Sequence, residues 1–404
     1  MISVEEAQPR ILAGLKPIDS ELEDLVHLTG RVAAEDIRAL GDNPPAPIAT
    51  VNGYALRRSD GDAPRKVAGK ATPGHPFQGT VGTNEAVRIV IGGIIPEGAA
   101  AIAFAEDTDD AGGDLQFNPA DVHPDYIRGA GLDFKSGTVL VPAGKRITAR
   151  DMSLLAAGGV AQAKVRRRPR VAIVSVGDEL SAPGEPRPHG SIYASTGYGL
   201  SAMIATWGGA PCDFGILEDS AQEIANIADA DAELVVTLGG HSVGNADLVA
   251  KALGTTDFRM DSWNVAYRPG RPLLYGRLGD TPVLGLPGNP ASALVCSILF
   301  IRPSIDIMLG TAQSMCSLPQ RFKCGCHTMT ARLRSALPAT DARQTYVRAS
   351  LIMQGGEVWA EPCPVLDYPM LSVLAKADAL VVLPPNAAPS QTGDRVEFIP
   401  LDGY

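Results

Sequence analysis

The sequence is poor in cysteine, and its few cysteines form no framework. Among 404 residues there are six, at positions 212, 296, 316, 324, 326 and 363. Scattered cysteines are typical of reduced thiols, so we expect a cytoplasmic protein without a disulfide scaffold. The run Cys324-Gly-Cys326-His327 suggests a zinc site. Its spacing, however, is too tight for the usual paired cysteines, and no second pair follows. We therefore expect no structural zinc ion.

Long apolar runs and an excess of positive charge are missing too. No stretch reaches the ~18 uninterrupted apolar residues of a membrane helix. The first residues, MISVEE, lack the basic and apolar pattern of a signal peptide. The formal net charge is −10, whereas nucleic-acid binders carry a basic footprint. We expect a soluble protein that binds neither nucleic acid nor a membrane.

The N-terminal part changes from helical to β-rich character. Residues 1–40 have helical periodicity, with a capping box of Ser3 and Glu6 and a second helical segment over residues 22–26. Residues 46–144 hold short apolar runs between glycine and proline clusters, which is typical of a small β-rich domain. A further helix follows in the next segment. We expect an N-terminal helical and linking region built from residues 1–45 and 145–168.

The remaining sequence predicts an α/β domain and a second β-domain. In residues 169–315, apolar strands alternate with helices, which indicates a doubly wound parallel sheet. These strands are residues 171–176, 234–238 and 282–286. The third leads into a helix that we expect to run from Pro290 to about residue 301. Residues 320–404 return to short strands, so we expect a C-terminal β-domain or barrel.

A basic run, RRRPR at residues 166–170, precedes the first of these strands. We expect it to be a solvated lead-in to the sheet. The alternative is that it helps to attract an anionic ligand.

The most informative stretch follows the second strand, where residues 239–247 read GGHSVGNAD. Gly239 and Gly240 let the backbone take positive φ and come close to a ligand. Ser242 and the following amides offer donors at a helix N-terminus, where an anion is favoured. Asp247 adds a carboxylate, which suits a cation beside a phosphate. The stretch indicates a phosphorylated ligand with a metal.

The loops after the other two strands lie at the same edge, because the carboxyl ends of parallel strands meet there. The first strand ends in GDEL and the third in PGNP, where Asn289 suits an N-cap and Pro290 the first helical position. One such loop is an ordinary βα turn; three at one edge favour a ligand site. We predict that Glu179 and Asp247 hold Mg²⁺, which prefers carboxylates, water and phosphate oxygens.

A turn reading RPGRP, residues 268–272, lies just before the third strand. Arg268 and Arg271 on a stiff turn suit oxyanions, because each guanidinium offers planar bidentate donors. The alternative is a surface turn that carries two solvated charges.

The glycine fingerprint of nicotinamide-dependent enzymes is absent. GxGxxG would follow the first strand of such a domain, and residues 177–180 read GDEL instead. This argues against a nucleotide-linked dehydrogenase.

Taken together, these motifs resemble those of the molybdopterin molybdotransferase family, the bacterial MoeA proteins and the E domain of gephyrin. The resemblance covers nearly the whole chain. It rests on residues 52–55 (NGYA, for DGYA), 88–93 (RIVIGG, for RIxTGA), 128–133 (RGAGLD, for RxxGED), 174–180 (VSVGDEL), 239–247 (GGxSxGxxD), 268–272 (RPGRP, for KPGKP) and 286–290 (LPGNP).

The resemblance implies an elongated homodimer with four regions per protomer, the central one related to the MogA/MoaB fold. It implies that molybdate is inserted into the dithiolene of adenylylated molybdopterin, with Mg²⁺ assisting and AMP released. The active cleft would lie between the α/β domain of one subunit and the β-rich part of the other. Other cofactor-synthesis proteins are expected as further partners.

Carried onto this sequence, the resemblance assigns roles to individual residues. The catalytic set is Glu179, Asp133, Asp247 and Asn52, the last standing where the family has an aspartate. The substrate-binding set is Gly239, Gly240, Ser242, Gly244, Arg268, Arg271, Pro287, Gly288 and Asn289.

Several cleft positions depart from the family pattern. Asn52 cannot carry negative charge. Ile91 replaces a threonine, Ala100 an aspartate and Leu132 a glutamate. Residues 191–196, SIYAST, lack an aspartate and an asparagine of the type IxDSN. A second hypothesis therefore stands beside the enzyme: a catalytically impaired paralogue that binds molybdopterin or its nucleotide as a carrier or scaffold.

Overall fold

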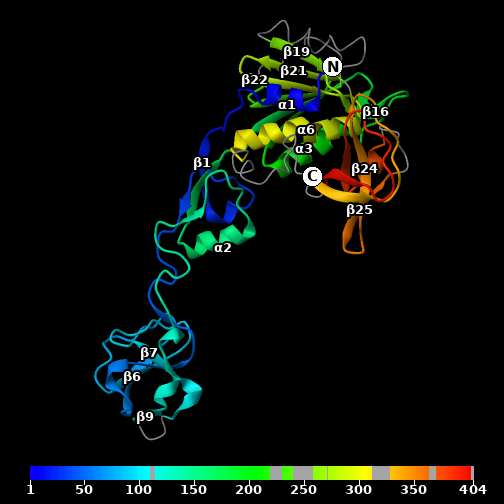
Figure 1. Cartoon of the computed structure of the whole chain (residues 1–404). Helices are drawn as coiled ribbons and strands as arrows, with labels where there is room; N and C mark the ends of the chain where they lie inside the picture. Colours follow the sequence, from blue (N-terminus) through cyan, green and yellow to red (C-terminus); the bar gives the residue numbers. More distant parts are fainter. Residues whose placement is uncertain are drawn as a thin grey trace.

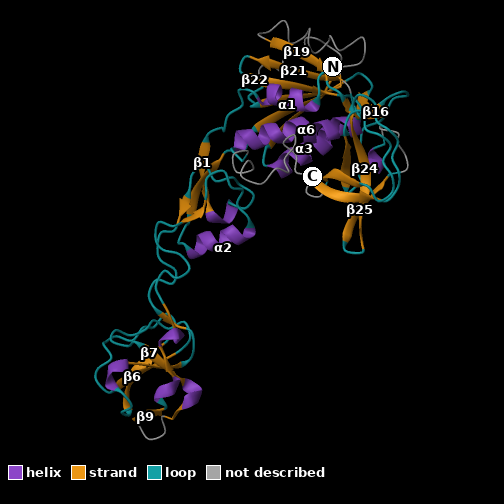
Figure 2. Ribbon diagram, viewed as in Figure 1, coloured by secondary structure: helices purple, strands orange, loops and turns teal. Residues whose placement is uncertain are grey.

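The molecule is elongated, with a β-rich domain at one end and two further domains at the other (Figure 1). The structure, a computed structural model, describes residues 1–109, 114–218, 230–239, 258–270, 272–311, 328–363 and 370–401. A narrow linking region joins the two ends. In the β-rich domain the helices are single short turns between strands and loops (Figure 2).

The linking region is assembled from segments on both sides of the β-rich domain in the sequence. Its elements are β1 (Ser20–Asp24) paired antiparallel with β13 (Gln162–Arg166), β2 (Ile37–Arg38) paired antiparallel with β12 (Val139–Val141), and α2 (Ala149–Ala157). Leu28, Phe134, Leu140, Val141 and Leu155 belong to one buried core. The two chain passages are therefore held together by apolar packing as well as by strand pairing.

The helical segment expected over residues 22–26 is wrong at its start, because Ser20–Asp24 forms β1. Alternate side chains of a strand share one face. Glu21 and Glu23 accordingly both pair with the buried Arg31, whose Nη1 lies 2.9 Å from Glu23 Oε2. The pairing with β13 and the ion pairs with the buried Arg31 guanidinium stabilise a strand here, although the sequence has a weak helical pattern.

The β-rich domain is a sheet of seven strands with an apolar core on each face. Its strand order is β10 (Val122–His123), β7 (Ala101–Phe104), β4 (Gly53–Leu56), β6 (Glu85–Ile89), β5 (Arg65–Ala71), β9 (Asp114–Phe117) and β8 (Thr108–Asp109). In β4, Ala55 packs in one core and Tyr54 and Leu56 in the other. A two-residue ladder, β3 (Ile48–Ala49) with β11 (Ile127–Arg128), connects the sheet to the linking region. Single helical turns of this domain lie at η2 (Arg58–Asp60), η3 (Ala105–Asp107), η4 (Pro119–Asp121) and η5 (Pro124–Tyr126), whereas η1 (Leu25–His27) belongs to the linking region.

The α/β domain contains a six-stranded sheet that is parallel over four strands. The order is β17 (Ala210–Leu217), β14 (Arg170–Val176), β18 (Leu234–Gly239), β22 (Thr281–Leu286), β21 (Pro272–Leu278) and β19 (Phe258–Asn264). The strands from β17 to β22 are parallel, as expected from the sequence, while β21 pairs antiparallel with both of its neighbours, β22 and β19. The helices α1 (Val4–Leu12), α3 (Thr196–Trp207) and α6 (Pro290–Leu309) share one core with one sheet face.

Two helices of this core follow their predicted caps. α1 opens with the predicted capping box, in which Ser3 N donates to Glu6 Oε2 at 2.9 Å. α6 begins at Pro290 as predicted but continues to Leu309, eight residues beyond the expected end. In the described part of the chain, α6 is the helix long and apolar enough to span a membrane by length and composition, but 78% of its apolar window is buried. It is a core helix.

The extra length of α6 includes Pro303, which has no N–H to donate to the Leu299 carbonyl one turn earlier. Gln8 of α1 replaces the missing donor. Its Nε2 donates to Leu299 O at 2.7 Å, and the side chain is buried. A long-range contact thus supplies a donor to a carbonyl that loses its usual helical partner at the proline.

The C-terminal domain is a closed barrel of five strands. The order is β24 (Gln344–Gln354), β25 (Glu357–Pro362), β23 (Met329–Leu333), β27 (Arg395–Pro400) and β26 (Ala379–Leu383), with β26 pairing back to β24. The expectation of a C-terminal barrel is confirmed. A short helix, α8 (Leu371–Leu374), precedes β26, and the α/β domain adds β20 (Tyr267–Arg268) in parallel to the start of β24.

Candidate functional site

A pocket lies at the carboxyl ends of β14, β18 and β22, where the three predicted loops come together. Its lining includes Ser175 at the end of β14, Glu179 in the first loop, Gly239 at the end of β18, and Gly288 before α6. The structure thus brings together one residue from each loop. This is the edge of a parallel sheet at which ligands bind in open α/β folds.

Gly239 is a position where the backbone requires glycine, and Gly288 of the third loop lies beside it. Gly239 has φ of +87°, and a Cβ on it would lie 2.6 Å from the carbonyl oxygen of Val176. A Cβ on Gly288 would lie 3.5 Å from the Gly239 Cα. The remaining predicted residues of the second loop, Gly240, Ser242, Gly244 and Asp247, lie outside the described residues.

Glu179 is held at the pocket by its backbone, while its carboxylate turns back over the first loop. Its carbonyl accepts from Ile192 N at 2.8 Å, beside the short parallel pair of β15 (Leu180–Ser181) and β16 (Ile192–Tyr193). A Cβ at Gly177 would overlap the Glu179 carboxylate. The carboxylate therefore needs glycine at 177 to occupy its present position.

Residues 191–196, identified from the sequence only as a departure from the family pattern, form one wall of the pocket. Tyr193, Ala194, Ser195 and Thr196 all line it. The Tyr193 hydroxyl donates to the Glu185 carbonyl at 3.3 Å, and the Arg187 guanidinium lies 5.6 Å from the ring centroid. Among the polar residues of the pocket that the sequence reasoning missed, Ser175 had the clearest signal, since it is the serine in an otherwise apolar run at residues 171–176.

The N-terminus of α6 borders the pocket at Pro290. The predicted cap is confirmed: Asn289 Oδ1 accepts from Ser292 N at 3.0 Å, and Pro290 is the first helical residue. The side-chain oxygen of Asn289 is thereby used in the helix. The start of a helix of twenty residues favours an anion at this side of the pocket.

Arg268 lies on β20, at the junction between the α/β domain and the barrel, and is not among the residues that line the pocket. It contributes to the electrostatic environment of Asp341. The hydrogen bond from Arg343, with a smaller contribution from Arg268, lowers the pKa of the Asp341 carboxyl to about 2. Arg271 and the zinc-like run at residues 324–327 lie outside the described residues.

Asn52 and Asp133 are separated from the pocket within one chain. Asn52 lies next to β4 in the β-rich domain, at the other end of the molecule (Figure 1), and its Oδ1 accepts from Ile91 N at 3.0 Å. Asp133 lies in the linking region, where its Oδ2 accepts from Asn43 Nδ2 at 3.1 Å. Two of the apolar departures are strongly exposed, Ile91 by 55% and Leu132 by 66%.

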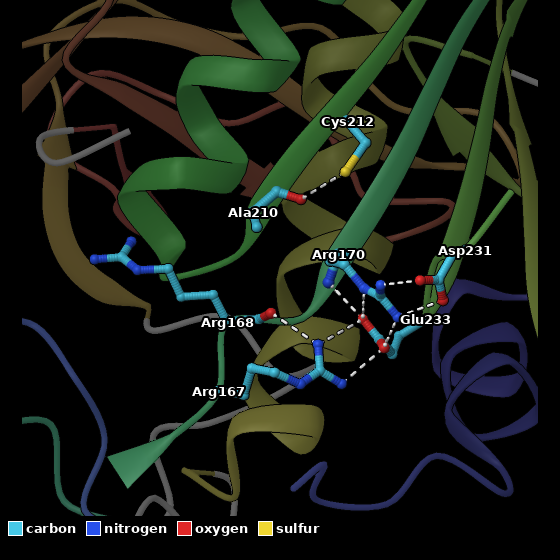
Figure 3. A network of polar contacts seen from close by, with 7 residues as sticks. All are labelled: Arg167, Arg168, Arg170, Ala210, Cys212, Asp231 and Glu233. Atoms are coloured by element: carbon cyan, nitrogen blue, oxygen red, sulfur yellow. Dashed lines mark hydrogen bonds and ion pairs between the residues drawn. The ribbon is translucent and has the colours of Figure 1, made fainter. Parts of the chain in front are cut away.

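The basic run at residues 166–170 serves the opposite end of the sheet from the pocket. Figure 3 shows Arg167 and Arg170 both directed at Glu233, with Asp231 beside Arg170. Arg167 Nη2 lies 2.8 Å from Glu233 Oε1, and Arg170 N donates to Glu233 Oε2 at 2.6 Å. Burial opposes ionisation of Glu233, but these donors outweigh it and lower its pKa to about 2.

This network joins the start of β14 to the start of β18. The charges of Arg167 and Arg170 are compensated by carboxylates, while Arg168 is exposed and points away from Glu233 (Figure 3). The run does lead into the sheet, but the expectation that it is solvated is wrong for Arg167 and Arg170, which are half-buried and paired with carboxylates. Because their charges are used in these pairs, they do not favour recruitment of an anion.

Sequence models of one protein family match three consecutive segments. The MoeA N-terminal region (domain I and II) matches residues 2–159, a probable molybdopterin binding domain matches residues 172–306, and the MoeA C-terminal region (domain IV) matches residues 330–401. A molybdopterin molybdenumtransferase from Haemophilus influenzae is 30% identical, over 100% of this chain and 99% of its own. The chain belongs to the MoeA family.

Further relatives agree with this membership. A molybdopterin molybdenumtransferase from a Nostoc species is 31% identical over 91% of this chain and 85% of its own. The crystal structure of a molybdopterin biosynthesis MoeA protein from Pyrococcus horikoshii superposes with a TM-score of 0.85, at 27% identity and 100% coverage of both chains. The family resemblance and the MoeA-type architecture expected from the sequence are confirmed.

Proposed function

We propose that this MoeA family member is a molybdopterin molybdenumtransferase, which inserts molybdate into adenylylated molybdopterin and releases AMP. The observation that carries the proposal is the set of relatives of that name. The Haemophilus influenzae protein aligns from end to end, so no domain of the relative is missing here. Function in molybdenum cofactor biosynthesis follows from the same likeness.

The pocket geometry supports a phosphorylated substrate in the α/β domain. Gly239 permits close approach of the backbone, Gly288 adds no side chain beside it, and the N-terminus of α6 favours negative charge. We propose that these residues, with Pro287 and Asn289, hold the substrate's phosphate side. Gly240, Ser242 and Gly244 are proposed for the same role.

Arginine at the barrel junction supports binding of molybdate. A guanidinium offers paired, planar donors to an oxyanion. Arg268 is exposed on β20, next to the barrel strand β24. We propose that Arg268 and Arg271 bind the molybdate that is to be inserted.

Mg²⁺ fits the donor chemistry of the pocket. The described lining offers the Glu179 carboxylate and the hydroxyl groups of Ser195 and Thr196. Mg²⁺ is bound through one or two carboxylates, with phosphate oxygens and water completing its shell. We propose Glu179 and Asp247 as its carboxylate ligands. When bound, the ion would neutralise charge on the pyrophosphate as AMP departs.

We propose a homodimer, as the family resemblance implies, and a cytoplasmic location. In one chain, Asn52 and Asp133 both lie away from the pocket. We propose that they complete the pocket of a second chain, which places the cleft between subunits. Contacts with other cofactor-synthesis proteins would use the surface of this dimer.

The proposal is tested by incubating the full-length protein with adenylylated molybdopterin, molybdate and Mg²⁺ and measuring AMP by chromatography. AMP release that requires both molybdate and the protein is the expected result. Tight binding of the substrate without any AMP above the protein-free control would contradict enzymatic function.

One observation favours the second candidate, a binding protein without turnover. The pocket wall carries Ala194 in a stretch where the family pattern has an aspartate, and Ile91 and Leu132 expose apolar side chains at cleft positions. Asn52→Asp separates the candidates. A faster release of AMP by this variant shows that the missing carboxylate limits an existing reaction, whereas no release from either form favours the carrier.

A further inference from the structure

The turn that carries Arg268 rests on a buried tyrosine. Tyr267 has no solvent exposure. Its hydroxyl donates to Cys296 Sγ at 3.2 Å, and its ring meets Phe300 edge to face with centroids 6.2 Å apart. Cys296 and Phe300 both belong to α6, the helix whose N-terminus borders the pocket.

Gly270 lies directly on the Tyr267 ring. A Cβ at Gly270 would come within 2.6 Å of Cε2, Cζ and the hydroxyl oxygen of Tyr267. Its φ of +126° also favours glycine. The backbone of the turn therefore packs on the phenol ring so closely that no side chain fits between them.

The same tyrosine is part of the junction with the barrel. Tyr267 pairs with Gln344 and Arg268 with Thr345 in the ladder between β20 and β24. Tyr267 and Tyr346 belong to one buried core together with Phe300. Arg268 is thus fixed by a strand ladder on one side and by the ring beneath the turn on the other.

The contact between Tyr267 and Cys296 is one of neutral groups. Burial raises the pKa of the Cys296 thiol to about 12 and raises the pKa of the Tyr267 hydroxyl well above its ordinary value. Neither group ionises in the range where the protein would work. The proposed chemistry uses neither group directly, so we assign both of them a structural role.

We propose that Tyr267 is a positioning residue for the oxyanion: its ring, anchored on α6 through Cys296 and Phe300, sets the turn that presents Arg268 to molybdate. This inference rests on the proposed function of Arg268. The inference predicts that removal of the Tyr267 ring weakens oxyanion binding more than removal of a buried ring of similar size elsewhere in the protein.

Three variants of the full-length protein test this claim, each with calorimetric titration of tungstate as a tetrahedral oxyanion and with the KM for molybdate in AMP release. Tyr267→Leu should raise both constants about ten-fold, with kcat changed less than about two-fold. Tyr267→Phe keeps the ring and its contact with Phe300 but loses the hydrogen bond to Cys296, so its two constants should lie between those of Tyr267→Leu and those of the unaltered protein. Phe398→Leu is the matched control, because Phe398 is a buried aromatic side chain of the separate barrel core and does not belong to the core that holds Tyr267.

The proposal is overturned if Tyr267→Leu and Phe398→Leu change the two constants equally. Should Tyr267→Leu fail to fold, Gly270→Ala provides the second test, since its Cβ would push the turn off the ring. It should raise the tungstate Kd about ten-fold without unfolding the protein; an unchanged Kd contradicts the claim. If the unaltered protein binds tungstate but releases no AMP, the proposed function fails while the positioning claim is still decided by Kd.

Discussion

At the residue scale, the pocket depends on carboxylate and glycine positions that the surrounding backbone fixes. Gly239 must be glycine, since both its φ and the nearby Val176 carbonyl exclude a side chain. Glu179 occupies the space above Gly177. The pocket therefore combines a backbone fixed at Gly239 with an exposed carboxylate at Glu179.

Glu179→Gln should lower the rate of AMP release about a hundred-fold, which corresponds to ~2.7 kcal/mol of transition-state stabilisation. The reason is that a neutral amide is a poor ligand for Mg²⁺. Because Glu179 is exposed, the melting temperature should not change. Glu185→Gln, an exposed carboxylate of the neighbouring loop, is the control and should leave the rate intact. Equal rates for the two variants would remove Glu179 from the mechanism.

Glu233 provides a prediction of pH dependence. Its pKa in the folded protein is about 2, below the ordinary 4.5, so the folded state holds the proton less tightly. The stabilisation is therefore complete above about pH 4.5 and is lost as the pH falls toward 2. Glu233→Gln should lower the free energy of unfolding by about 1–3 kcal/mol at pH 7. The difference between the two proteins, measured by urea denaturation, should shrink below pH 4; a constant difference would contradict the assignment.

At the element scale, several boundaries are decided by contacts between segments far apart in the sequence. The apolar runs at residues 171–176 and 234–238 predict two of the parallel strands, because a continuous apolar run indicates a buried strand without knowledge of its neighbours. The end of α6 could not be predicted, since Gln8 is 291 positions away from the carbonyl it satisfies. β1 was missed for the same reason: its partner β13 lies beyond the whole β-rich domain.

The pairing of Gln8 with Leu299 can be tested by a double-mutant cycle. Gln8→Leu should lower the free energy of unfolding by about 1–3 kcal/mol, because it leaves a buried carbonyl without a donor. Pro303→Ala restores an N–H one turn away, so Gln8→Leu should cost less in that background. Urea denaturation of the four proteins measures the coupling. An identical cost in both backgrounds would show that Gln8 does not act through this carbonyl.

The candidate site was partly accessible to the same reasoning. The three loops could be placed at one edge because parallel strands carry their carboxyl ends to the same side. Tyr193 and its neighbours could not be placed, since β16 is only two residues long and is fixed by its pairing with β15. The contact of Tyr267 with α6 could not be predicted either, because Tyr267 and Cys296 are 29 positions apart in the sequence.

At the scale of the whole molecule, the cores show where the domains divide. Phe134, Leu140 and Val141 pack in the linking-region core with Leu28. We therefore propose that the β-rich domain ends before Phe134 rather than at residue 144, and that the other boundaries stand as expected. Limited proteolysis should release a fragment that ends near residue 130; a stable fragment that extends to 144 would contradict this.

A shared cleft makes a prediction about mixed dimers. Asp133→Ala chains and Glu179→Gln chains should each be inactive, since each spoils every cleft of its own homodimer. Co-expressed at random, half of the dimers are mixed and each keeps one intact cleft, so roughly a quarter of full activity should return. Activity measured on purified mixed protein would remain at the level of the single variants if each chain carried a complete site.

The central claim is that this MoeA family member transfers molybdenum to molybdopterin. It is tested most directly by measuring AMP released and molybdenum bound to molybdopterin in the same reaction, the first by chromatography and the second by mass spectrometry of the isolated product. The account predicts that the two rise together in equimolar amounts and only when protein, molybdate and Mg²⁺ are all present. AMP without molybdenum in the product, or neither above background, would contradict it.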